Sequence, residues 1–183
     1  PLLTKLTTDD LRGLLSPDYE DINDHRPIMD GKRLVEGNHI FYMGTDTLAD
    51  ESVGKAMSTM ALAELSSVAA EIYNHGDASK DDGSQPRRVH VVVDEWRDAA
   101  CEPMIQQANK GRGAGFFIWA MGQTFSDLVD KFGGNTARAR TFIGNMNNLI
   151  VGATQDPDTM NLIIDKLGET SIIVKSQSSG MGS

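Results

Sequence analysis

Apolar residues along this chain gather in short runs that alternate with stretches of helical periodicity. The clearest run is Val89–Val93, which starts after the turn-forming residues 83–86 and ends in Asp94 and Glu95. A short β-branched run between such signals is typical of a buried strand in a parallel sheet. Similar runs predict four further strands, at residues 39–44, 116–121, 148–152 and 170–174.

Between these runs, apolar residues recur every three or four positions, which predicts helices. The longest covers residues 51–74 and ends at Gly76, a residue that favours helix termination. Shorter helices are expected near residues 11–15, 28–35, 103–110, 126–131, 136–142 and 156–167. Residues 77–86 are expected to be an exposed loop, and residues 96–102 a loop or irregular turn. Strands that alternate with helices predict an α/β fold, a mostly parallel layered sheet flanked by helices.

Length and composition restrict the class of protein further. The 183 residues suffice for one α/β domain, and the net charge of −9 excludes a protein that binds nucleic acid through bulk positive charge. The single cysteine, Cys101, excludes an intrachain disulfide framework and fits a reducing cytoplasm. No apolar run reaches the roughly 20 residues of a membrane span. Because the chain opens on Pro1 and closes on the polar tail 176–183, it is interpreted as a piece of a longer protein, with a flexible tail.

Two adjacent acids at the carboxyl end of a buried strand are costly unless they serve a site, because ligands of open α/β sheets bind at that edge. The pattern has the form of a Walker B element. In this interpretation Asp94 holds Mg²⁺, usually through water, and Glu95 polarises the attacking water. The alternative is that both acids simply point into solvent.

Two further side chains are candidates for the same chemistry. Gln123 follows the strand at 116–121, so its amide is expected near the acids and suited to report the state of a γ-phosphate. The alternative is a polar residue that simply closes a strand. Arg112 lies among glycines, in a segment expected to be mobile and able to reach a phosphate on an adjacent subunit. An exposed loop charge is the alternative for Arg112.

The interval 110–140 is the most basic part of this acidic chain. It contains Lys110, Arg112, Lys131, Arg138 and Arg140. A rim that faces DNA and a set of scattered solvent charges are both consistent with it, since no aromatic residues are interleaved for base stacking.

No segment matches the phosphate-binding loop G-x-x-x-x-G-K-[ST]. The pairs Gly31-Lys32 and Gly54-Lys55 lack both the earlier glycine and the following hydroxyl residue. Without that loop there is neither a phosphate cradle nor its lysine. The chain alone is therefore expected not to turn over nucleotide and to bind none tightly.

Several ordered motifs extend the pattern around Asp94 and Glu95. They are Val92–Glu95, Asn109–Phe116 and Gly122–Thr124, with Leu14–Pro17, Tyr42–Asp50 and Gly144–Ile150 on either side. Together they resemble the ATPase domain of TraD-like conjugative coupling proteins of integrative conjugative elements. The resemblance covers most of the chain, from about Leu11 to Val174.

The resemblance implies a RecA-like P-loop NTPase core that lacks its Walker A part. That core would span residues 39–175, after a connector of short helices at 1–38 that borders on, or belongs to, a helical accessory region. The parent would be a DNA-translocating ATPase that uses ATP and Mg²⁺, assembles as a homo-hexamer and is anchored at the cytoplasmic face of the bacterial inner membrane by segments missing here.

By the same resemblance, Asp94 and Glu95 are the Walker B pair, Gln123 the sensor glutamine and Arg112 an arginine finger that acts in trans. The implied partners are single-stranded DNA, the relaxase and relaxosome, and the channel proteins of type IV secretion. Because the Walker A loop is missing, this chain on its own is expected to be inactive.

Two other functions stay open. One is a related hexameric motor, such as a secretion assembly ATPase or a chromosome translocase. The other is a non-catalytic docking module for relaxase or accessory proteins, although the joint presence of Asp94, Glu95 and Gln123 argues against a pure scaffold.

Overall fold

A computed structural model describes residues 2–7, 11, 13, 15, 20–23, 25, 30–45, 50–76, 87–99 and 102–168. Within them, β1 (Val89–Val93) and β2 (Phe116–Ala120) pair in parallel, with Val89 opposite Phe116 and Val93 opposite Ala120. The sequence prediction of these two strands, and of their parallel pairing, is confirmed. The fold of the described part is α/β, with one two-stranded parallel sheet.

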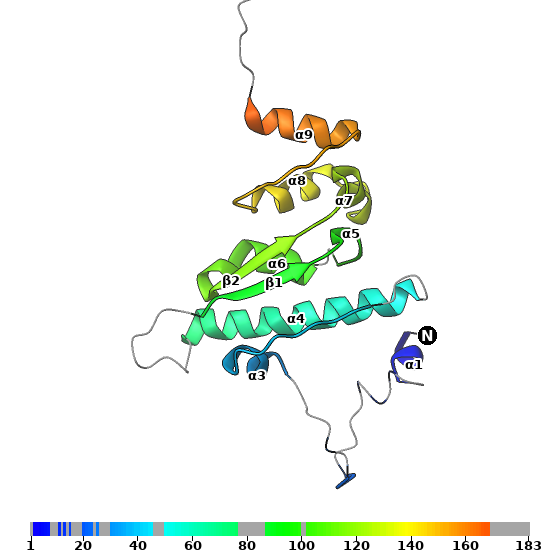
Figure 1. Ribbon diagram of the computed structural model, residues 1–183, viewed down its shortest axis with the longest axis vertical. Helices are drawn as coiled ribbons and strands as arrows, with labels where there is room; N and C mark the ends of the chain where they lie inside the picture. Colours follow the sequence, from blue (N-terminus) through cyan, green and yellow to red (C-terminus); the bar gives the residue numbers. More distant parts are fainter. Residues whose placement is uncertain are drawn as a thin grey trace, which may run out of the picture.

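Helices make up most of the remaining structure (Figure 1). They are α1 (Leu2–Leu6), α3 (Gly31–Glu36), α4 (Glu51–His75), α5 (Trp96–Ala99), α6 (Glu102–Lys110), α7 (Phe125–Lys131), α8 (Thr136–Gly144) and α9 (Pro157–Leu167), with a 3₁₀ turn, η1 (Gly111–Ala114). Side-chain oxygens of Asp50, Thr124, Asn135 and Asp156 accept backbone N–H groups at the starts of α4, α7, α8 and α9. These caps satisfy donors that the first helical turn leaves free, which fixes where each helix begins.

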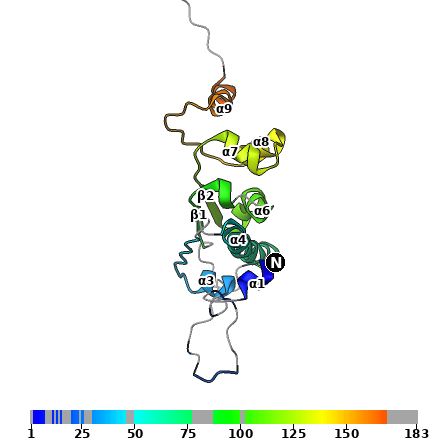
Figure 2. The ribbon, with the colours of Figure 1, turned by 90° about the vertical axis from the view of Figure 1, so that its right-hand side faces the viewer.

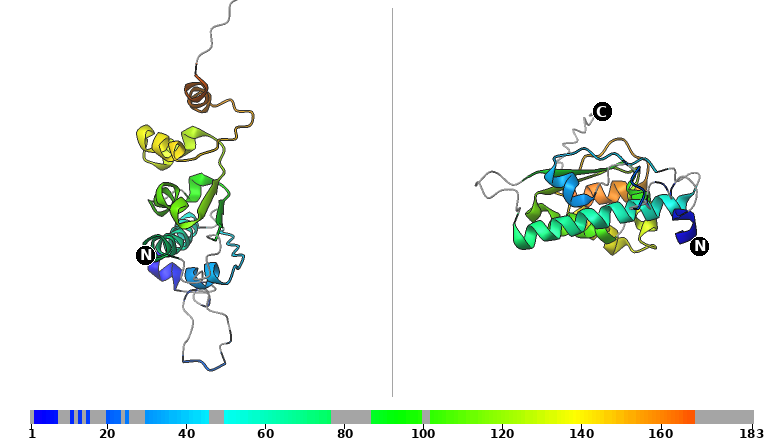
Figure 3. Two further views of the ribbon diagram at one scale, coloured as in Figure 1. Left: turned by 90° about the vertical axis from the view of Figure 1, so that its left-hand side faces the viewer. Right: turned by 90° about the horizontal axis from the view of Figure 1, so that it is seen from below.

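The core lies on one face of the sheet. Figures 2 and 3 show α4, α6 and α8 on the same side of the two strands. The side chains of Met104, Leu128, Ala139 and Phe142 are fully enclosed there. On the opposite face, His90 stacks on Phe117 and accepts a hydrogen bond from Trp119 Nε1 at 3.0 Å, and these side chains are exposed. The sheet is thus covered on one face by the described helices and open on the other.

Two predicted strands are wrong in the described structure. Residues 39–44 and 148–152 run extended but belong to no ladder, and Ile40, Tyr42 and Ile150 are 97%, 90% and 92% exposed. A strand forms only where a neighbour offers backbone partners, and neither segment has one among the described residues. Their apolar composition correctly predicts an extended backbone, but it does not predict whether a neighbouring strand is available for pairing.

Residues 96–102 also differ from prediction, because Trp96–Ala99 forms the short helix α5 in place of a loop. Its first backbone N–H, that of Trp96, donates to Met121 O at 2.7 Å, so the turn is held by the neighbouring strand exit. The predictions for 77–86, 170–174 and 176–183, and most of 11–15, lie outside the described residues. No helix in the described ranges has the length and apolar character of a membrane span.

Candidate functional site at the carboxyl edge of the sheet

The exit of β1 has an unusual backbone. Glu95 has φ of +71°, a left-handed conformation that costs an L-residue with a long side chain about 1–2 kcal/mol. The chain reverses there because Met121 N donates to Val93 O at 2.9 Å, and Met121 O accepts from Trp96 N. These two hydrogen bonds with Met121, at the exit of β2, hold Val93 and Trp96, the residues on either side of Asp94 and Glu95. Backbone outliers that the surroundings enforce in this way are concentrated at functional sites.

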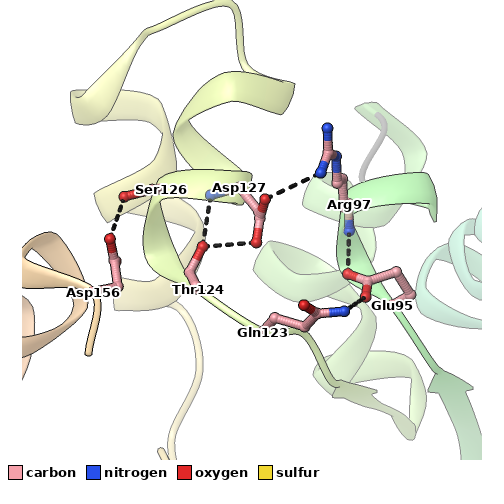
Figure 4. Close-up of polar contacts among 7 residues, drawn as sticks. All are labelled: Glu95, Arg97, Gln123, Thr124, Ser126, Asp127 and Asp156. Atoms are coloured by element: carbon pink, nitrogen blue, oxygen red, sulfur yellow. Dashed lines mark hydrogen bonds and ion pairs between the residues drawn. The ribbon is translucent and has the colours of Figure 1, made fainter. Parts of the chain in front are cut away.

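The Glu95 carboxylate contacts the exit of β2. Gln123 Nε2 donates to Glu95 Oε2 at 3.2 Å, and the backbone N–H of Arg97 donates to Glu95 Oε1 at 3.3 Å (Figure 4). Both carboxylate oxygens thus accept a hydrogen bond while the side chain stays partly exposed. The predicted proximity of Glu95 and Gln123 is therefore found, and the two side chains come from adjoining strand ends.

A second set of contacts supports this pair. Arg97 Nη1 lies 3.3 Å from Asp127 Oδ1, and Asp127 Oδ2 accepts from Thr124 Oγ1 at 2.7 Å. Thr124 in turn accepts from the backbone N–H of Asp127 at 3.0 Å, which caps α7 directly after Gln123. Figure 4 shows the resulting chain of contacts from Glu95 to the start of α7. The position of Gln123 is thus fixed by the helix that follows it.

Helix α9 is attached to the same region. Ser126 Oγ donates to Asp156 Oδ1 at 2.8 Å, and the buried backbone N–H of Phe125 donates to Thr159 Oγ1 at 2.8 Å. The hydrogen bond from the Thr159 hydroxyl, followed by that from Ser126, holds the pKa of Asp156 below its ordinary value. Asp156 therefore stays ionised in the folded state to lower pH than in the unfolded chain.

Asp94 is exposed at the same edge, one position before the left-handed residue. Its carboxylate and that of Glu95 are the hard oxygen ligands that Mg²⁺ prefers, and Mg²⁺ sites commonly combine one or two carboxylates with water and phosphate. No group of three acidic, histidine or cysteine side chains is gathered for a metal within the described ranges. Asp94 and Glu95 are thus the residues at this edge whose oxygens could hold such a cation.

Arg112 lies at the other end of the sheet. It belongs to η1, directly before β2, whereas Glu95 and Gln123 follow the strands, so the length of a strand, about 16 Å, separates them along the sheet. In place of the loop predicted here, residues 111–114 form the 3₁₀ turn η1, which packs on α4. A Cβ at Gly113 would lie 2.8 Å from the Tyr73 ring, and one at Gly111 would lie 2.6 Å from Gln107 Oε1. The glycines permit close packing of the turn, and Arg112 itself projects into solvent.

Two of the five residues in the basic interval form ion pairs with acidic neighbours, and a third contacts a backbone carbonyl. Arg138 pairs with Glu102, and Arg140 Nη1 lies 3.0 Å from Asp165 Oδ2. Lys131 Nζ donates to the backbone carbonyl of Asp98 at 3.2 Å. Of the two original alternatives, this geometry favours charges compensated at the surface over a continuous DNA-facing rim.

Sequence reasoning missed the supporting residues. Thr124 and Asp127 have the spacing of a helix-capping box, a signal that identifies them as the start of α7. Arg97 carried no local signal, because its partner lies 30 positions away. Gly122 is required by packing, since a Cβ there would lie 2.2 Å from Trp96 Nε1. All of these residues shape the exits of β1 and β2.

The fold and this edge define an α/β protein with a carboxylate–amide site at adjoining ends of parallel strands. A family model described as the TraM recognition site of TraD and TraG matches residues 88–183. The chain belongs to this family, which confirms the resemblance to TraD-like conjugative coupling proteins and a coupling-protein role in conjugation. No curated protein and no solved structure matches the chain.

Proposed function

We propose that this chain is part of a hexameric, DNA-translocating ATPase that passes relaxase-bound single-stranded DNA to a type IV secretion channel. The single observation that carries the proposal is the hydrogen bond between Gln123 and the Glu95 carboxylate across two parallel strand exits. Membership of the TraD and TraG family supports the conjugative setting. The parent would act at the cytoplasmic face of the inner membrane.

Each residue at the edge has a role in this proposal. Asp94 would hold Mg²⁺ through water, and Mg²⁺ would neutralise charge on the phosphates of ATP. Glu95 orients and polarises the attacking water, because its carboxylate is partly exposed and held by Gln123 and the Arg97 amide. Movement of Gln123 away from Glu95 upon contact with a phosphate would couple the nucleotide state to α7, which starts two residues later.

Arg112 fits a role in trans for a geometric reason. The strand length between Arg112 and Glu95 prevents it from reaching a nucleotide held at the carboxyl edge of its own subunit, and its exposed position leaves it accessible to a neighbour. Because residues 1–183 contain no phosphate-binding loop, we assign the cradle to another part of the polypeptide. The chain alone would then be inactive.

The Glu95 role is tested in a longer polypeptide that includes the phosphate-binding loop. Glu95→Gln should leave binding of Mg-ATP within about twofold and abolish steady-state hydrolysis, because the amide cannot accept the proton of the attacking water. Glu36→Gln, an exposed substitution on α3, is the matched control and should retain full turnover. Retained hydrolysis in the Glu95 variant would remove this residue as the base.

The trans role is tested by mixing two inactive variants. Arg112→Ala subunits keep an intact Glu95, and Glu95→Gln subunits keep an intact Arg112, so mixed hexamers contain some complete sites. Activity should rise from near zero in either pure variant to a maximum at intermediate ratios, since an arginine finger contributes about 10³–10⁵ in rate. No recovery at any ratio would exclude Arg112 as a trans finger.

A docking function is the second candidate, and the family description favours it. That description names recognition of TraM, and the matched region is 88–183. We infer that this region binds a TraM-type accessory protein of the relaxosome. Isothermal titration of the chain with such a protein should give saturable binding that is independent of nucleotide. Binding only in the presence of ATP would tie recognition to the motor cycle and refute an independent docking module.

A further inference from the structure

Arg97 touches both sides of the carboxyl edge. Its backbone N–H donates to Glu95 Oε1 at 3.3 Å, and its guanidinium Nη1 lies 3.3 Å from Asp127 Oδ1. Glu95 lies two residues after the end of β1, whereas Asp127 lies in the first turn of α7, which follows β2. Together with the hydrogen bond from Gln123 to Glu95 Oε2, these contacts form a closed ring across the two strand exits (Figure 4). Arg97 is the member of this ring that joins α5 to α7.

The position of Gln123 depends on the backbone that carries it, because its side chain is exposed and is not held by surrounding core residues. Before Gln123, the backbone is fixed at Met121, which exchanges hydrogen bonds with β1 and with the first residue of α5. After Gln123, the backbone enters α7 through Thr124. The Thr124 hydroxyl accepts from Asp127 N–H at 3.0 Å and donates to Asp127 Oδ2 at 2.7 Å. A shift of the first turn of α7 would therefore displace Gln123.

Side chains join α5 to α7 at both ends of α7. Arg97 contacts Asp127 in the first turn, and Lys131 Nζ, in the last turn, donates to Asp98 O at 3.2 Å. The first of these contacts is the one that adjoins Gln123. The Arg97 side chain is 62% exposed and that of Asp127 is 23% exposed, so their attraction is weak and is screened by salt. A contact of this strength shifts an equilibrium between two arrangements of α7 by a few-fold and does not lock either one.

We propose that Arg97 is a positioning residue that acts through Asp127. Its ion pair holds the first turn of α7 against α5 and so keeps Gln123 on the Glu95 carboxylate. The inference rests on the proposed function, in which Gln123 leaves Glu95 on contact with a phosphate. The ion pair favours the bonded arrangement and the phosphate favours the released one, so the two oppose each other. Without the ion pair, the ratio of released to bonded Gln123 should rise about two- to fivefold, as expected for a partly exposed ion pair.

The first experiment uses residues 1–183 without nucleotide, so its outcome is independent of any ATPase activity. NMR of the isotope-labelled side-chain amide of Gln123 reports whether this group is bonded to Glu95. Glu95→Gly, which removes the carboxylate and accepts the positive φ, provides the signal of the released amide. Arg97→Met keeps the apolar stem without the charge and should move the Gln123 signal towards that reference. Arg97→Lys keeps the charge and should leave the signal near its native position.

Salt and a partner variant distinguish positioning from a general loss of structure. Raising the ionic strength to about 1 M, where the screening length falls to about 3 Å, should move the Gln123 signal of the native chain towards that of Arg97→Met. The signal of Arg97→Met itself should not respond. Asp127→Asn retains an oxygen for the Thr124 hydroxyl and removes the charge, so it should match Arg97→Met, and the double variant should match either single one. Lys131→Met, at the other end of α7, is the matched control and should leave Gln123 unchanged.

The second experiment measures Mg-ATP affinity in a longer polypeptide that includes the phosphate-binding loop. Arg97→Met should bind Mg-ATP about two- to fivefold more tightly than the native protein, because a larger fraction of molecules already has Gln123 released. Damage to the fold would weaken binding, so a gain in affinity identifies a positioning role. Arg97→Lys and Lys131→Met should both have native affinity.

The proposal fails if the Gln123 signal is the same in Arg97→Met and in the native chain, whatever the ATPase activity. An equal shift in Lys131→Met would also overturn it, because the position of Gln123 would then follow from general contact between α5 and α7. Weaker Mg-ATP binding by Arg97→Met would refute the opposition between the ion pair and the phosphate. The predicted shift of Gln123 in a protein whose longer form binds no ATP would support the positioning of Gln123 by Arg97 and contradict the proposed motor.

Discussion

Replacement of Glu95 by glycine and by alanine separates the backbone of this site from its chemistry. Both substitutions remove the carboxylate and its hydrogen bonds with Gln123 and the Arg97 amide, so those losses cancel in the comparison. What differs is the left-handed backbone at φ +71°, which glycine adopts without the clash of a Cβ atom.

The magnitude follows from two opposing terms. The left-handed conformation costs an L-residue about 1–2 kcal/mol, whereas glycine loses about 0.5–1 kcal/mol more conformational freedom on folding than alanine. The difference leaves Glu95→Gly more stable than Glu95→Ala by roughly 1 kcal/mol. For a chain of this size, such a difference raises the melting temperature by about 2–4 °C.

Position 94 provides a control of opposite sign. Asp94 does not have a positive φ, so a glycine there gains no relief from strain and adds only its larger loss of conformational entropy on folding. Asp94→Gly should be less stable than Asp94→Ala by about 0.5–1 kcal/mol. Urea unfolding with equal m-values across the four variants measures both differences. If alanine equals or exceeds glycine in stability at position 95, the strained conformation of Glu95 is refuted.

Two further predictions concern the supporting fold. Gly115→Ala should destabilise the fold by clearly more than Gly133→Ala. Both glycines have positive φ, a conformation that costs alanine about 1–2 kcal/mol at either position. A Cβ atom at Gly115 would in addition lie 2.1 Å from a backbone carbonyl oxygen, whereas nothing lies within 4 Å of one at Gly133. Equal costs in urea unfolding would contradict the close approach at Gly115. The Thr159 hydroxyl lowers the pKa of Asp156 in the folded state below its value in the unfolded chain, about 3.9. Ionised Asp156 therefore stabilises the fold above that pH, and this stabilisation is lost as the pH falls through the lower pKa of the folded state. Asp156→Asn should therefore flatten the stability profile below about pH 4, and an unchanged acid limb would contradict this assignment.

The sequence predicted the centre of the site because its signals are local. Val89–Val93 with its following acids, and the strand before Gln123, each carry a complete pattern within a few residues. Once both were assigned as parallel neighbours, the meeting of Glu95 and Gln123 followed from sheet geometry. Helices α4 and α9 were equally readable, since caps and helical periodicity are short-range features.

What the sequence did not predict depends on distant partners. Residues 148–152 read as a strand, but a strand also needs a neighbour, and the described residues offer none within reach. The contact of Arg97 with Asp127 joins residues 30 positions apart. The sequence placed Arg112 in a loop because glycines commonly mark loops, whereas the segment is a 3₁₀ turn in which Gly113 permits the close approach of Tyr73.

The most direct test of the proposed motor is ATP hydrolysis with and without single-stranded DNA. It compares residues 1–183 with a longer polypeptide that includes a phosphate-binding loop, both folded and at concentrations that allow oligomers to form. The account predicts no turnover by 1–183, turnover by the longer polypeptide, and further acceleration by DNA. Absence of turnover in both would contradict a motor role for the carboxyl edge of β1 and β2 and would favour the docking function.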